Sequence, residues 1–291
     1  MKSSLTLIGF GEAGSTFAIA GGWGSRARVH DRLTDDETTR GDKLDDYARA
    51  MVLGCDSTAD AVSGAPLILS LVTADQVLAA AWSAAAAIAP GALYCDMNSV
   101  APETKRAAAA AIDAAGGRYV DVAVMAPVDP ARLNVPLLLS GAAAGDAAAA
   151  LRDFGFGNIR VAGDAVGRAS SIKMIRSVMV KGLEALTAEC VLAAEAAGVT
   201  DEVLASLDAS EKASAWGDRA NYNLDRMMRH GLRRAAEMEE VVKTLDALGT
   251  GSAMTRGTVE RQRAIGDARI APPAGLAAKI AALNDSKANA A

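Results

Sequence analysis

The segment LTLIGFGEAG at residues 5–14 constrains the fold of this chain more than any other. A short apolar run leads into glycines with the spacing G-x-G-x-x-G, and a mostly small, apolar stretch follows. This order is typical of a buried strand, a tight turn and a helix whose N-terminus faces an anion. The first glycine permits the bend, the second lets the backbone approach a pyrophosphate, and the third lets the helix pack close to the sheet. A plain strand-to-helix turn without a ligand remains the alternative.

Asp31 and Arg32 stand where a bound dinucleotide would place its adenosine ribose. Asp31 ends the second predicted strand, and a carboxylate there binds ribose hydroxyls and repels a 2′-phosphate, which favours NAD. Arg32 follows directly, and an arginine there binds that phosphate in a forked geometry, although a solvated loop arginine is an equal alternative. The sequence therefore predicts NAD or NADP, with a slight preference for NAD. The predicted cofactor-binding residues of this region are Gly9, Phe10, Gly11, Glu12, Ala13, Gly14, Asp31 and Arg32.

Short apolar runs alternate with helical segments as far as about residue 162. Strands and helices alternating at this spacing predict an α/β Rossmann domain with a doubly wound, mostly parallel sheet, which we place at residues 1–163. The predicted strands are Leu5–Gly9, Arg28–Asp31, Leu67–Val72, Ala92–Met97, Tyr119–Val124 and Pro136–Ser140, and the predicted helices lie near 12–21, 43–50, 75–88, 103–115 and 145–153.

The strand pattern disappears after about Val166, and residues 166–197 read as one long helix that Gly198 ends. At ~1.5 Å per residue this helix is longer than most helices of globular proteins. Further helical segments follow at 201–212, 215–229, 232–248 and 252–265, with a short helix after a Pro-Gly break near the C-terminus. We therefore expect an all-helical domain at residues 164–291, led by the long helix.

Composition excludes several classes of protein. Of the 291 residues, 51% are hydrophobic, so we expect the helical segments to be folded around a large core. Only 4% are aromatic, so we expect this core to consist of Ala, Val, Leu, Ile and Met. A net charge of −5 without a basic block argues against a nucleic-acid partner. Three widely spaced cysteines and two histidines predict a reducing cytoplasm, no disulfide framework and no metal site. With neither a signal-peptide pattern nor a long uninterrupted apolar stretch, we expect no membrane association.

A polar stripe on the long helix is a candidate catalytic element. Lys173, Arg176, Ser177, Lys181 and Glu184 fall within about 140° of one another on a helix that is otherwise apolar. The helix begins the second domain directly after the sheet, where a crevice between domains is expected, and a lysine there can donate a proton to a carbonyl oxygen. A solvated helix face is the alternative, in which Lys181 and Glu184 form an exposed ion pair.

At this point the chain resembles the β-hydroxyacid dehydrogenases, relatives of 6-phosphogluconate and 3-hydroxyisobutyrate dehydrogenases. The segment Asp96–Val100, followed by Pro102, resembles the family's loop after the fifth strand, and Gly167 followed by Lys173 resembles its catalytic lysine motif. The resemblance implies that Lys173 is the general acid/base and that Val72, Thr73 and Asn98 line the cofactor side. It also implies a dimer built through the helical domains, which the apolar circumference of the long helix favours.

The chain departs from the family pattern mainly where a substrate would bind. The family's Asp-x-Pro-Val-Ser-Gly-Gly loop appears here as Asp121–Pro127, without its serine and glycines, so the wall formed by Met125, Ala126 and Pro127 is more apolar. A bulkier or less charged substrate than a simple 3-hydroxy acid is the expectation. Ser177 replaces an asparagine and would hold a reacting hydroxyl more loosely, and His230 stands where a lysine is usual.

The sequence as a whole predicts an NAD(P)-dependent oxidoreductase that moves hydride between nicotinamide and a hydroxyl or carbonyl carbon of a small molecule. Alternatives for single residues stay open: Asp96 as a loop-orienting group, Ser99 as a helix N-cap, and His230 as a solvent-facing side chain. The alternative functions are an imine reductase and a non-catalytic dinucleotide-binding protein. The predicted substrate-binding residues are Asn98, Ser99, Met125, Ala126, Pro127, Ser177, Lys181 and His230.

Overall fold

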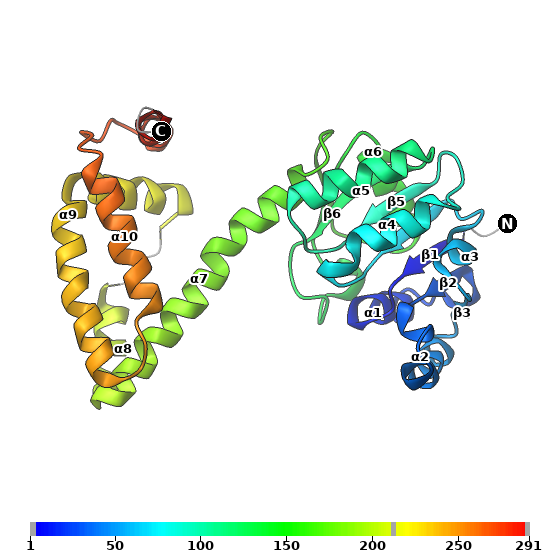
Figure 1. Ribbon diagram of the computed structural model, residues 1–291, viewed down its shortest axis with the longest axis horizontal. Coiled ribbons are helices and arrows are strands. Elements are labelled where there is room, and N and C mark those ends of the chain that lie inside the picture. The colour runs from blue at the N-terminus through cyan, green and yellow to red at the C-terminus, as the bar shows by residue number, and fades with distance from the viewer. Residues whose placement is uncertain (1–3, 211–213, 289–291) are drawn as a thin grey trace. The chain divides into compact units, whose positions relative to one another are not determined.

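The computed structural model describes residues 4–210 and 214–288, and the side chains of several helical residues, including Lys181 and Glu184, lie outside that description. The chain divides into two compact units, Met1–Val178 and Met179–Ala291. All the described strands lie in the first unit, and the described part of the second unit is helical (Figure 1).

The first unit is built on an eight-stranded sheet with the order β3-β2-β1-β4-β5-β6-β7-β8. Only the β6–β7 pair is antiparallel; the other neighbouring pairs run parallel. The predicted doubly wound, mostly parallel sheet is therefore confirmed. The strands are β1 (Leu5–Ile8), β2 (Ala27–His30), β3 (Leu53–Gly54), β4 (Leu67–Ser70), β5 (Leu93–Asp96), β6 (Arg118–Val124), β7 (Leu137–Ser140) and β8 (Ile159–Gly163).

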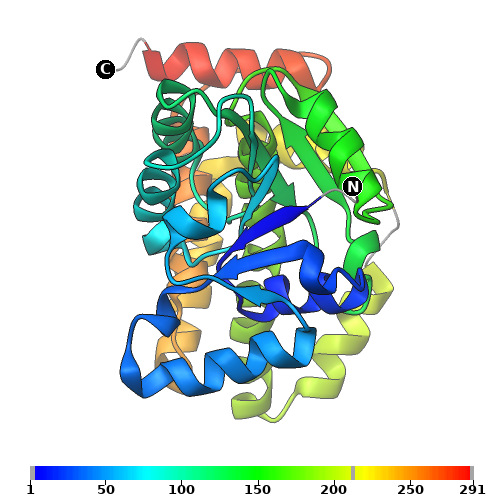
Figure 2. The same cartoon turned by 90° about the vertical axis from the view of Figure 1, so that its right-hand side faces the viewer.

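Helices cover both faces of this sheet, as Figures 1 and 2 show. One apolar cluster joins the sheet to α1 (Glu12–Ala20), α2 (Glu37–Ala50) and α6 (Ala144–Asp153). A second cluster, on the opposite face, joins it to α3 (Thr58–Val62), α4 (Val77–Ala85) and α5 (Pro102–Ala114). Alanines fill much of both clusters, which lets the helices pack close to the strands as the composition predicts.

The register of the strands brings polar residues to one edge of the sheet. Ile8, Ser70 and Asp96 are the last residues of their strands, with Ile8 opposite Ser70 and Ser70 opposite Asp96. Asp96 lies opposite Asp121, which is within β6. Ser140 of the antiparallel strand β7 lies opposite Asp121 in turn. Ligand sites of open α/β sheets lie outside the carboxyl ends of the strands, so this row of side chains marks the functional edge.

Two strands and one helix of the structure were not predicted from the sequence. β3 has only two residues, both exposed, and β8 is half-exposed at the edge of the sheet, so neither carries a buried apolar run. Helix α3 has five residues and begins at the N-cap Ser57, whose side chain accepts a hydrogen bond from the backbone N–H of Asp60. These short elements extend the sheet at its two edges and connect β3 to β4.

The long helix α7 (Arg168–Ala197) has 30 residues and ends at Gly198, whose φ of +69° is left-handed, as the sequence predicts. It is followed by α8 (Thr200–Ser210), α9 (Trp216–Leu248), α10 (Ala253–Asp267) and α11 (Leu276–Ala288). The predicted break between residues 229 and 232 is wrong, because α9 continues through Gly231. A Cβ on Gly231 would lie 2.4 Å from the carbonyl oxygen of Gln262, so this glycine permits close packing of α9 on α10.

The predicted domain boundary after residue 163 falls between β8 and α7, whereas the compact units divide within α7 after Val178. The assignment of residues 164–178 to the helical domain stays a prediction. In the second unit, the Glu189 carboxylate of α7 accepts hydrogen bonds from the backbone N–H groups of Met254 and Thr255, and so holds the start of α10. None of the helices in the described ranges is both long and apolar enough to cross a membrane.

Candidate active site

The glycine turn after β1 has the geometry that a dinucleotide requires. Gly9 has a φ of +89°, and a Cβ there would lie 2.4 Å from the carbonyl oxygen of Leu71. A Cβ on Gly14 would lie 2.8 Å from the carbonyl oxygen of Gly9, so only a glycine lets α1 start this close to the turn. A Cβ on Gly11 would meet nothing within 4 Å, which leaves open space beside the backbone for a ligand. The donor-rich start of α1 faces the same space.

The Asp31 carboxylate connects this turn to the end of β2. Its Oδ2 accepts a hydrogen bond of 2.6 Å from the backbone N–H of Phe10, and its Oδ1 accepts one of 2.9 Å from the backbone N–H of Leu33. Both oxygens therefore already have a backbone donor. Besides its predicted role toward the ribose hydroxyls, Asp31 therefore fixes the glycine turn.

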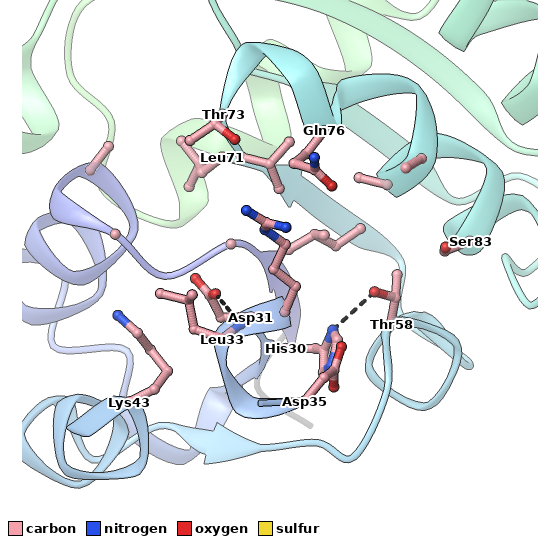
Figure 3. A pocket seen from close by; sticks show the side chains of 18 of the residues that line it. His30, Asp31, Leu33, Asp35, Lys43, Thr58, Leu71, Thr73, Gln76 and Ser83 are labelled. Carbon is pink, nitrogen blue, oxygen red and sulfur yellow. Dashed lines mark hydrogen bonds and ion pairs between the residues drawn. The ribbon is translucent and has the colours of Figure 1, made fainter. Parts of the chain in front are cut away.

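A cavity of about 470 Å³ lies over the turn (Figure 3). Its floor comes from β1 and β2, and its far wall from the start of α4. Three predicted cofactor residues do not line it: the Phe10 ring packs 5.2 Å from that of Tyr47, Gly14 is buried, and Asn98 lies outside the lining. The predicted residues that do line it are Gly9, Gly11, Glu12, Ala13, Asp31, Arg32, Val72 and Thr73.

Several residues of this cavity were missed from the sequence. Figure 3 shows His30 between Thr58 and Asp35, with its ring nitrogens 3.0 Å from Thr58 Oγ1 and 3.2 Å from Asp35 Oδ1. Lys43 donates hydrogen bonds of 3.0 Å to the carbonyl oxygen of Phe10 and 2.7 Å to Asp46 Oδ2. The sequence could have indicated His30 as a residue of this cavity, because it lies in a predicted strand next to Asp31. For Lys43 and Thr58 it gave no such indication, since they come from helices that only the tertiary fold brings to the turn.

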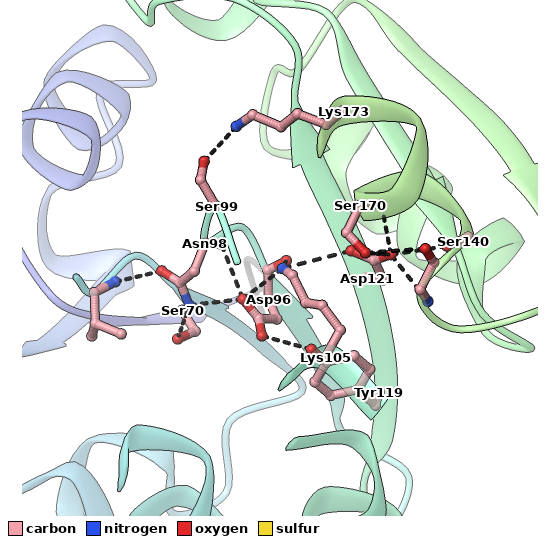
Figure 4. Close-up of polar contacts among 12 residues, drawn as sticks. Ser70, Asp96, Asn98, Ser99, Lys105, Tyr119, Asp121, Ser140, Ser170 and Lys173 are labelled. Atoms are coloured by element: carbon pink, nitrogen blue, oxygen red, sulfur yellow. Dashed lines mark hydrogen bonds and ion pairs between the residues drawn. The ribbon is translucent and has the colours of Figure 1, made fainter. Parts of the chain in front are cut away.

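Asn98 is held by hydrogen bonds to three neighbouring residues (Figure 4). Its Oδ1 accepts a hydrogen bond of 2.7 Å from the backbone N–H of Val72, a residue of the cavity lining. Its Nδ2 donates to Ser70 Oγ at 3.0 Å and to Asp96 Oδ1 at 2.7 Å. The predicted cofactor residue Asn98 therefore acts on the cavity through the backbone of Val72.

A fully buried ion cluster lies beneath Asn98. Lys105 Nζ donates hydrogen bonds to the carbonyl oxygen of Asp96 at 2.7 Å and to Asp96 Oδ1 at 2.8 Å, and lies 3.6 Å from Asp121 Oδ1. The side chains of Lys105, Asp96 and Asp121 are 0% exposed. Tyr119 donates a hydrogen bond of 2.6 Å to Asp96 Oδ2, and burial together with the Asp96 charge raises the pKa of Tyr119 well above its ordinary value. Asp96 is thus a loop-orienting group, the structural alternative weighed in the sequence analysis.

The same cluster anchors the first turn of α7. Asp121 Oδ2 accepts hydrogen bonds from the backbone N–H of Gly167 at 3.2 Å, and from the backbone N–H and the hydroxyl of Ser170, both at 3.0 Å. Ser140 Oγ accepts a hydrogen bond of 2.9 Å from the backbone N–H of Ala169 and donates one to Asp121. A carboxylate at this position satisfies otherwise unpaired N–H groups and complements the helix dipole.

This anchored helix brings Lys173 to Ser99, with 2.5 Å between Lys173 Nζ and Ser99 Oγ (Figure 4). The N-cap interpretation of Ser99 is wrong, because α5 begins at Pro102 with Ala101 as its N-cap residue. The hydroxyl of Ser177 donates to the carbonyl oxygen of Lys173, one turn earlier in α7, at 3.0 Å. Its hydrogen therefore already has an acceptor within the helix.

The remaining predicted substrate residues are distributed over both units. Met125 is half-buried and its carbonyl oxygen accepts a hydrogen bond of 3.2 Å from Arg176 Nη1, whereas Ala126 and Pro127 are exposed. His230 lies on α9 in the second unit, and the side chain of Lys181 lies outside the described residues. Their predicted roles stay predictions.

Two family models match the chain. The NAD binding domain of 6-phosphogluconate dehydrogenase matches residues 4–152, just over half of the 291-residue chain. A domain of unknown function (DUF1932) matches residues 194–265. A curated relative from Methanothermus fervidus, an uncharacterized 28.5 kDa protein, is 31% identical over 151 residues, and this match spans 52% of the chain and 57% of the relative.

Solved structures cover nearly the whole chain. A conserved hypothetical protein from Sinorhizobium meliloti 1021 is 35% identical with a TM-score of 0.62, over 98% of this chain and 97% of that one. A conserved protein of unknown function, described as structurally similar to 3-hydroxyacid dehydrogenases, is 30% identical with a TM-score of 0.58, over 91% of this chain and 98% of that one.

A Streptomyces aurantiacus imine reductase has a TM-score of 0.69 over 96% of this chain and 99% of its own, and at 20% identity it shows the fold alone. The family model over residues 4–152 covers the glycine turn, and the two solved structures at 30–35% identity cover both units. The chain therefore belongs to the 6-phosphogluconate dehydrogenase-like family of NAD(P)-dependent oxidoreductases.

Proposed function

We propose that this protein transfers hydride between the nicotinamide of NAD(P) and a carbon that carries a hydroxyl or carbonyl group, with Lys173 as the general acid/base. The observation that carries the proposal is the pair of Lys173 Nζ and Ser99 Oγ, 2.5 Å apart, next to Asn98. Asn98 contacts the backbone of Val72, which lines the dinucleotide cavity. These contacts, from Lys173 to Ser99 and from the adjacent Asn98 to Val72, support the assignment of Lys173 as a proton donor near the cofactor.

In the proposed reaction, the residues of this chain would have the following roles. NAD(P), when bound, supplies or accepts the hydride. The Lys173 ammonium group donates a proton to the substrate oxygen during carbonyl reduction, and its amine removes that proton in the reverse direction. The Ser99 hydroxyl holds the same oxygen, since a hydroxyl both donates and accepts hydrogen bonds. Asp121 and Ser140 keep the start of α7, and with it Lys173, in register with the sheet.

The cavity fits a dinucleotide by its own features. A Cβ-free backbone at Gly11 faces open space beside the start of α1, and Arg32 and Lys43 supply positive charge among the lining residues. The buried Asp31 carboxylate would meet a 2′-phosphate unfavourably, which supports the slight preference for NAD, whereas Arg32 supports NADP. The proposed cofactor is therefore NAD or NADP, with Arg32 as the residue to test.

The substrate wall and the exposed surface of α7 support two further parts of the proposal. The side chains of Met125, Ala126 and Pro127 carry no charge, so we expect a substrate that is bulkier or less charged than a small dianionic acid. Ile175 and Val178 of α7 are both 71% exposed, and a second copy of the chain would cover such apolar side chains. We therefore propose a homodimer built through the helical regions, in the cytoplasm.

An imine reductase is the second candidate. The fold shared with an imine reductase and the apolar substrate wall favour it. The retained Lys173 favours the dehydrogenase, since the related imine reductases commonly replace this lysine. A non-catalytic dinucleotide-binding protein remains the third interpretation, because the family's substrate loop is altered.

One experiment separates these candidates. The purified chain is screened with NAD and NADP against 3-hydroxy acids, simple alcohols and cyclic imines, beside the Lys173→Met and Lys173→Arg variants. We expect hydroxyl or carbonyl turnover that falls by about 10²–10⁴-fold in Lys173→Met, the range of a general acid/base. Lys173→Arg keeps the charge but cannot exchange a proton at neutral pH, so it should be equally impaired.

Cofactor affinity, measured by NAD(P)H fluorescence, should stay unchanged in both variants and serves as the control for folding. Full hydroxy-acid activity in Lys173→Met would disprove the catalytic assignment. Turnover of cyclic imines alone would favour the imine reductase, and cofactor binding without any turnover would favour the non-catalytic protein.

A further inference from the structure

The helical unit contains a second polar cavity, of about 310 Å³, between α9 and α10. Five of its lining residues come from α9 and one from α10. All of them fall within residues 194–265, the part of the chain that matches a domain of unknown function. The lining residues are Tyr222, Asn223, Arg226, Met227, Arg234 and Gln262.

Two guanidinium groups line this cavity, and its described lining residues include no carboxylate. Among the described side chains, no ion pair joins Arg226 or Arg234 to an acidic residue. Neighbouring arginines of α9 and α10 behave differently: Arg229 lies 2.8 Å from Asp225, and Arg263 forms an ion pair with Glu239. The positive charge of the cavity is therefore not neutralised by the described part of the chain.

The cavity also contains a buried donor and a buried acceptor without partners. The Nε–H of Arg234 is buried and has no hydrogen-bond partner among the described residues. Gln262 is only 8% exposed, and its Oε1 likewise lacks a partner there. Buried polar groups in native proteins are nearly always paired, so an unpaired donor and acceptor in one cavity point to a ligand that supplies both.

Close packing of the two helices fixes the position of these groups. Gly231 of α9 and Gly266 of α10 meet so closely that a Cβ on Gly266 would lie 2.6 Å from the backbone nitrogen of Leu232. Arg234 follows Gly231 by one turn on α9, and Gln262 precedes Gly266 by one turn on α10. The donor and the acceptor are thus attached to the two sides of one rigid contact.

We propose that this cavity binds a small organic carboxylate that carries a hydroxyl group beside it. The carboxylate would accept charge-assisted hydrogen bonds from Arg226 and Arg234, and the hydroxyl would donate to Gln262 Oε1. Arginine suits this role because its planar fork matches the two oxygens of a carboxylate. The site belongs to the helical unit alone, so the proposal does not depend on hydride transfer.

Direct binding to the full-length protein tests the proposal, by isothermal titration calorimetry with glycolate, acetate and inorganic phosphate as probes. We expect saturable binding of glycolate, weaker binding of acetate and weaker binding of phosphate. Arg226→Gln and Arg234→Gln should each weaken glycolate binding by about tenfold or more, because each removes hydrogen bonds from a charged donor. The control variant Arg229→Gln lies on the same helix outside the cavity and should bind glycolate as the unmodified chain does.

Gln262→Met gives an independent readout. It removes the acceptor while keeping a side chain of similar length, so glycolate affinity should fall to that of acetate while acetate affinity stays constant. Circular dichroism of each variant confirms that the helices are retained. Absence of saturable glycolate binding, an equal loss in Arg229→Gln, or tighter binding of phosphate than of glycolate would each overturn the assignment.

Discussion

Replacing Lys105 by methionine would leave two buried carboxylates without their cation. Lys105 contacts Asp96 at 2.8 Å and Asp121 at 3.6 Å, and all three side chains are 0% exposed. Methionine fills a similar volume but carries no charge and donates no hydrogen bond. The carbonyl oxygen of Asp96, which accepts from Lys105 Nζ at 2.7 Å, would lose this donor as well.

The expected loss is large because the partners are fully buried. Removing one member of a buried ion pair costs about 3–5 kcal/mol, since the remaining charge stays out of water. For a unit of this size, each kcal/mol lowers Tm by roughly 2–4 °C, so the variant should melt roughly 6–20 °C lower. Arg118→Met is a matched control on β6: its ion pair with Asp146 is 43% and 65% exposed, and its loss should cost no more than about 1 kcal/mol.

Urea unfolding followed by circular dichroism measures both variants, and the double variant Lys105→Met with Asp96→Asn gives a second readout. Neutralising Asp96 removes one of the stranded charges, so the double variant should recover part of the stability lost by Lys105→Met. A loss in Lys105→Met no larger than that in Arg118→Met would refute the reasoning. A double variant less stable than Lys105→Met would also refute it, because the two side chains would then stabilise the fold independently.

Three further predictions follow from the structure. In a Cys190→Ser background, a thiol reagent should label half-buried Cys55 before buried Cys95. Burial and the charge of Asp96 raise the pKa of the Cys95 thiol to about 12, which keeps it in the unreactive form. Equal labelling rates would contradict the burial of Cys95. Burial tends to raise the pKa of Glu189, but hydrogen bonds from Thr255 and from backbone N–H groups outweigh it and lower this pKa. The ionised Glu189 therefore stabilises the fold at pH values above the ordinary glutamate pKa. This stabilisation is lost as the pH falls through the lowered pKa of the folded state. Glu189→Gln should therefore flatten the acid side of the pH–stability curve, and an unchanged curve would exclude this contribution. Arg32→Ala should weaken NADP binding by about tenfold and NAD binding less; equal losses, measured by fluorescence titration, would place Arg32 away from the 2′-phosphate.

The sheet was predictable because its central strands are continuous apolar runs bounded by glycines and polar residues. Leu5–Ile8 and Leu67–Ser70 are such runs, and both are fully buried. The edge strands β3 and β8 lack this signal because they are exposed or half-exposed. The predicted break between residues 229 and 232 was wrong because a glycine inside a helical pattern is typical of a helix end. Here Gly231 instead allows α9 to pack closely against α10.

The candidate site was predictable only in part. Lys173 and Ser99 were found through local motifs, and the fold brings them together. Lys105 gave no signal, because it stands among charged residues at the start of an alanine-rich helix and its partners come from other strands. Arg226 and Arg234 likewise lie in a helix with many charged residues. Arg229 forms an ion pair with Asp225, whereas no ion pair joins Arg226 or Arg234 to an acidic residue among the described side chains, and that difference is a property of the fold.

Helix α7 belongs to both compact units, because the division at Val178 falls inside it. Its first turn is tied to the sheet by Asp121 and Ser140, and Lys173 lies only one turn further along. The proposed proton donor therefore belongs to the same compact unit as the nucleotide-binding sheet, and not to the helical second unit. A change confined to the second unit would therefore leave the first turn of α7 attached to Asp121 and Ser140, because all of these residues lie in the first unit.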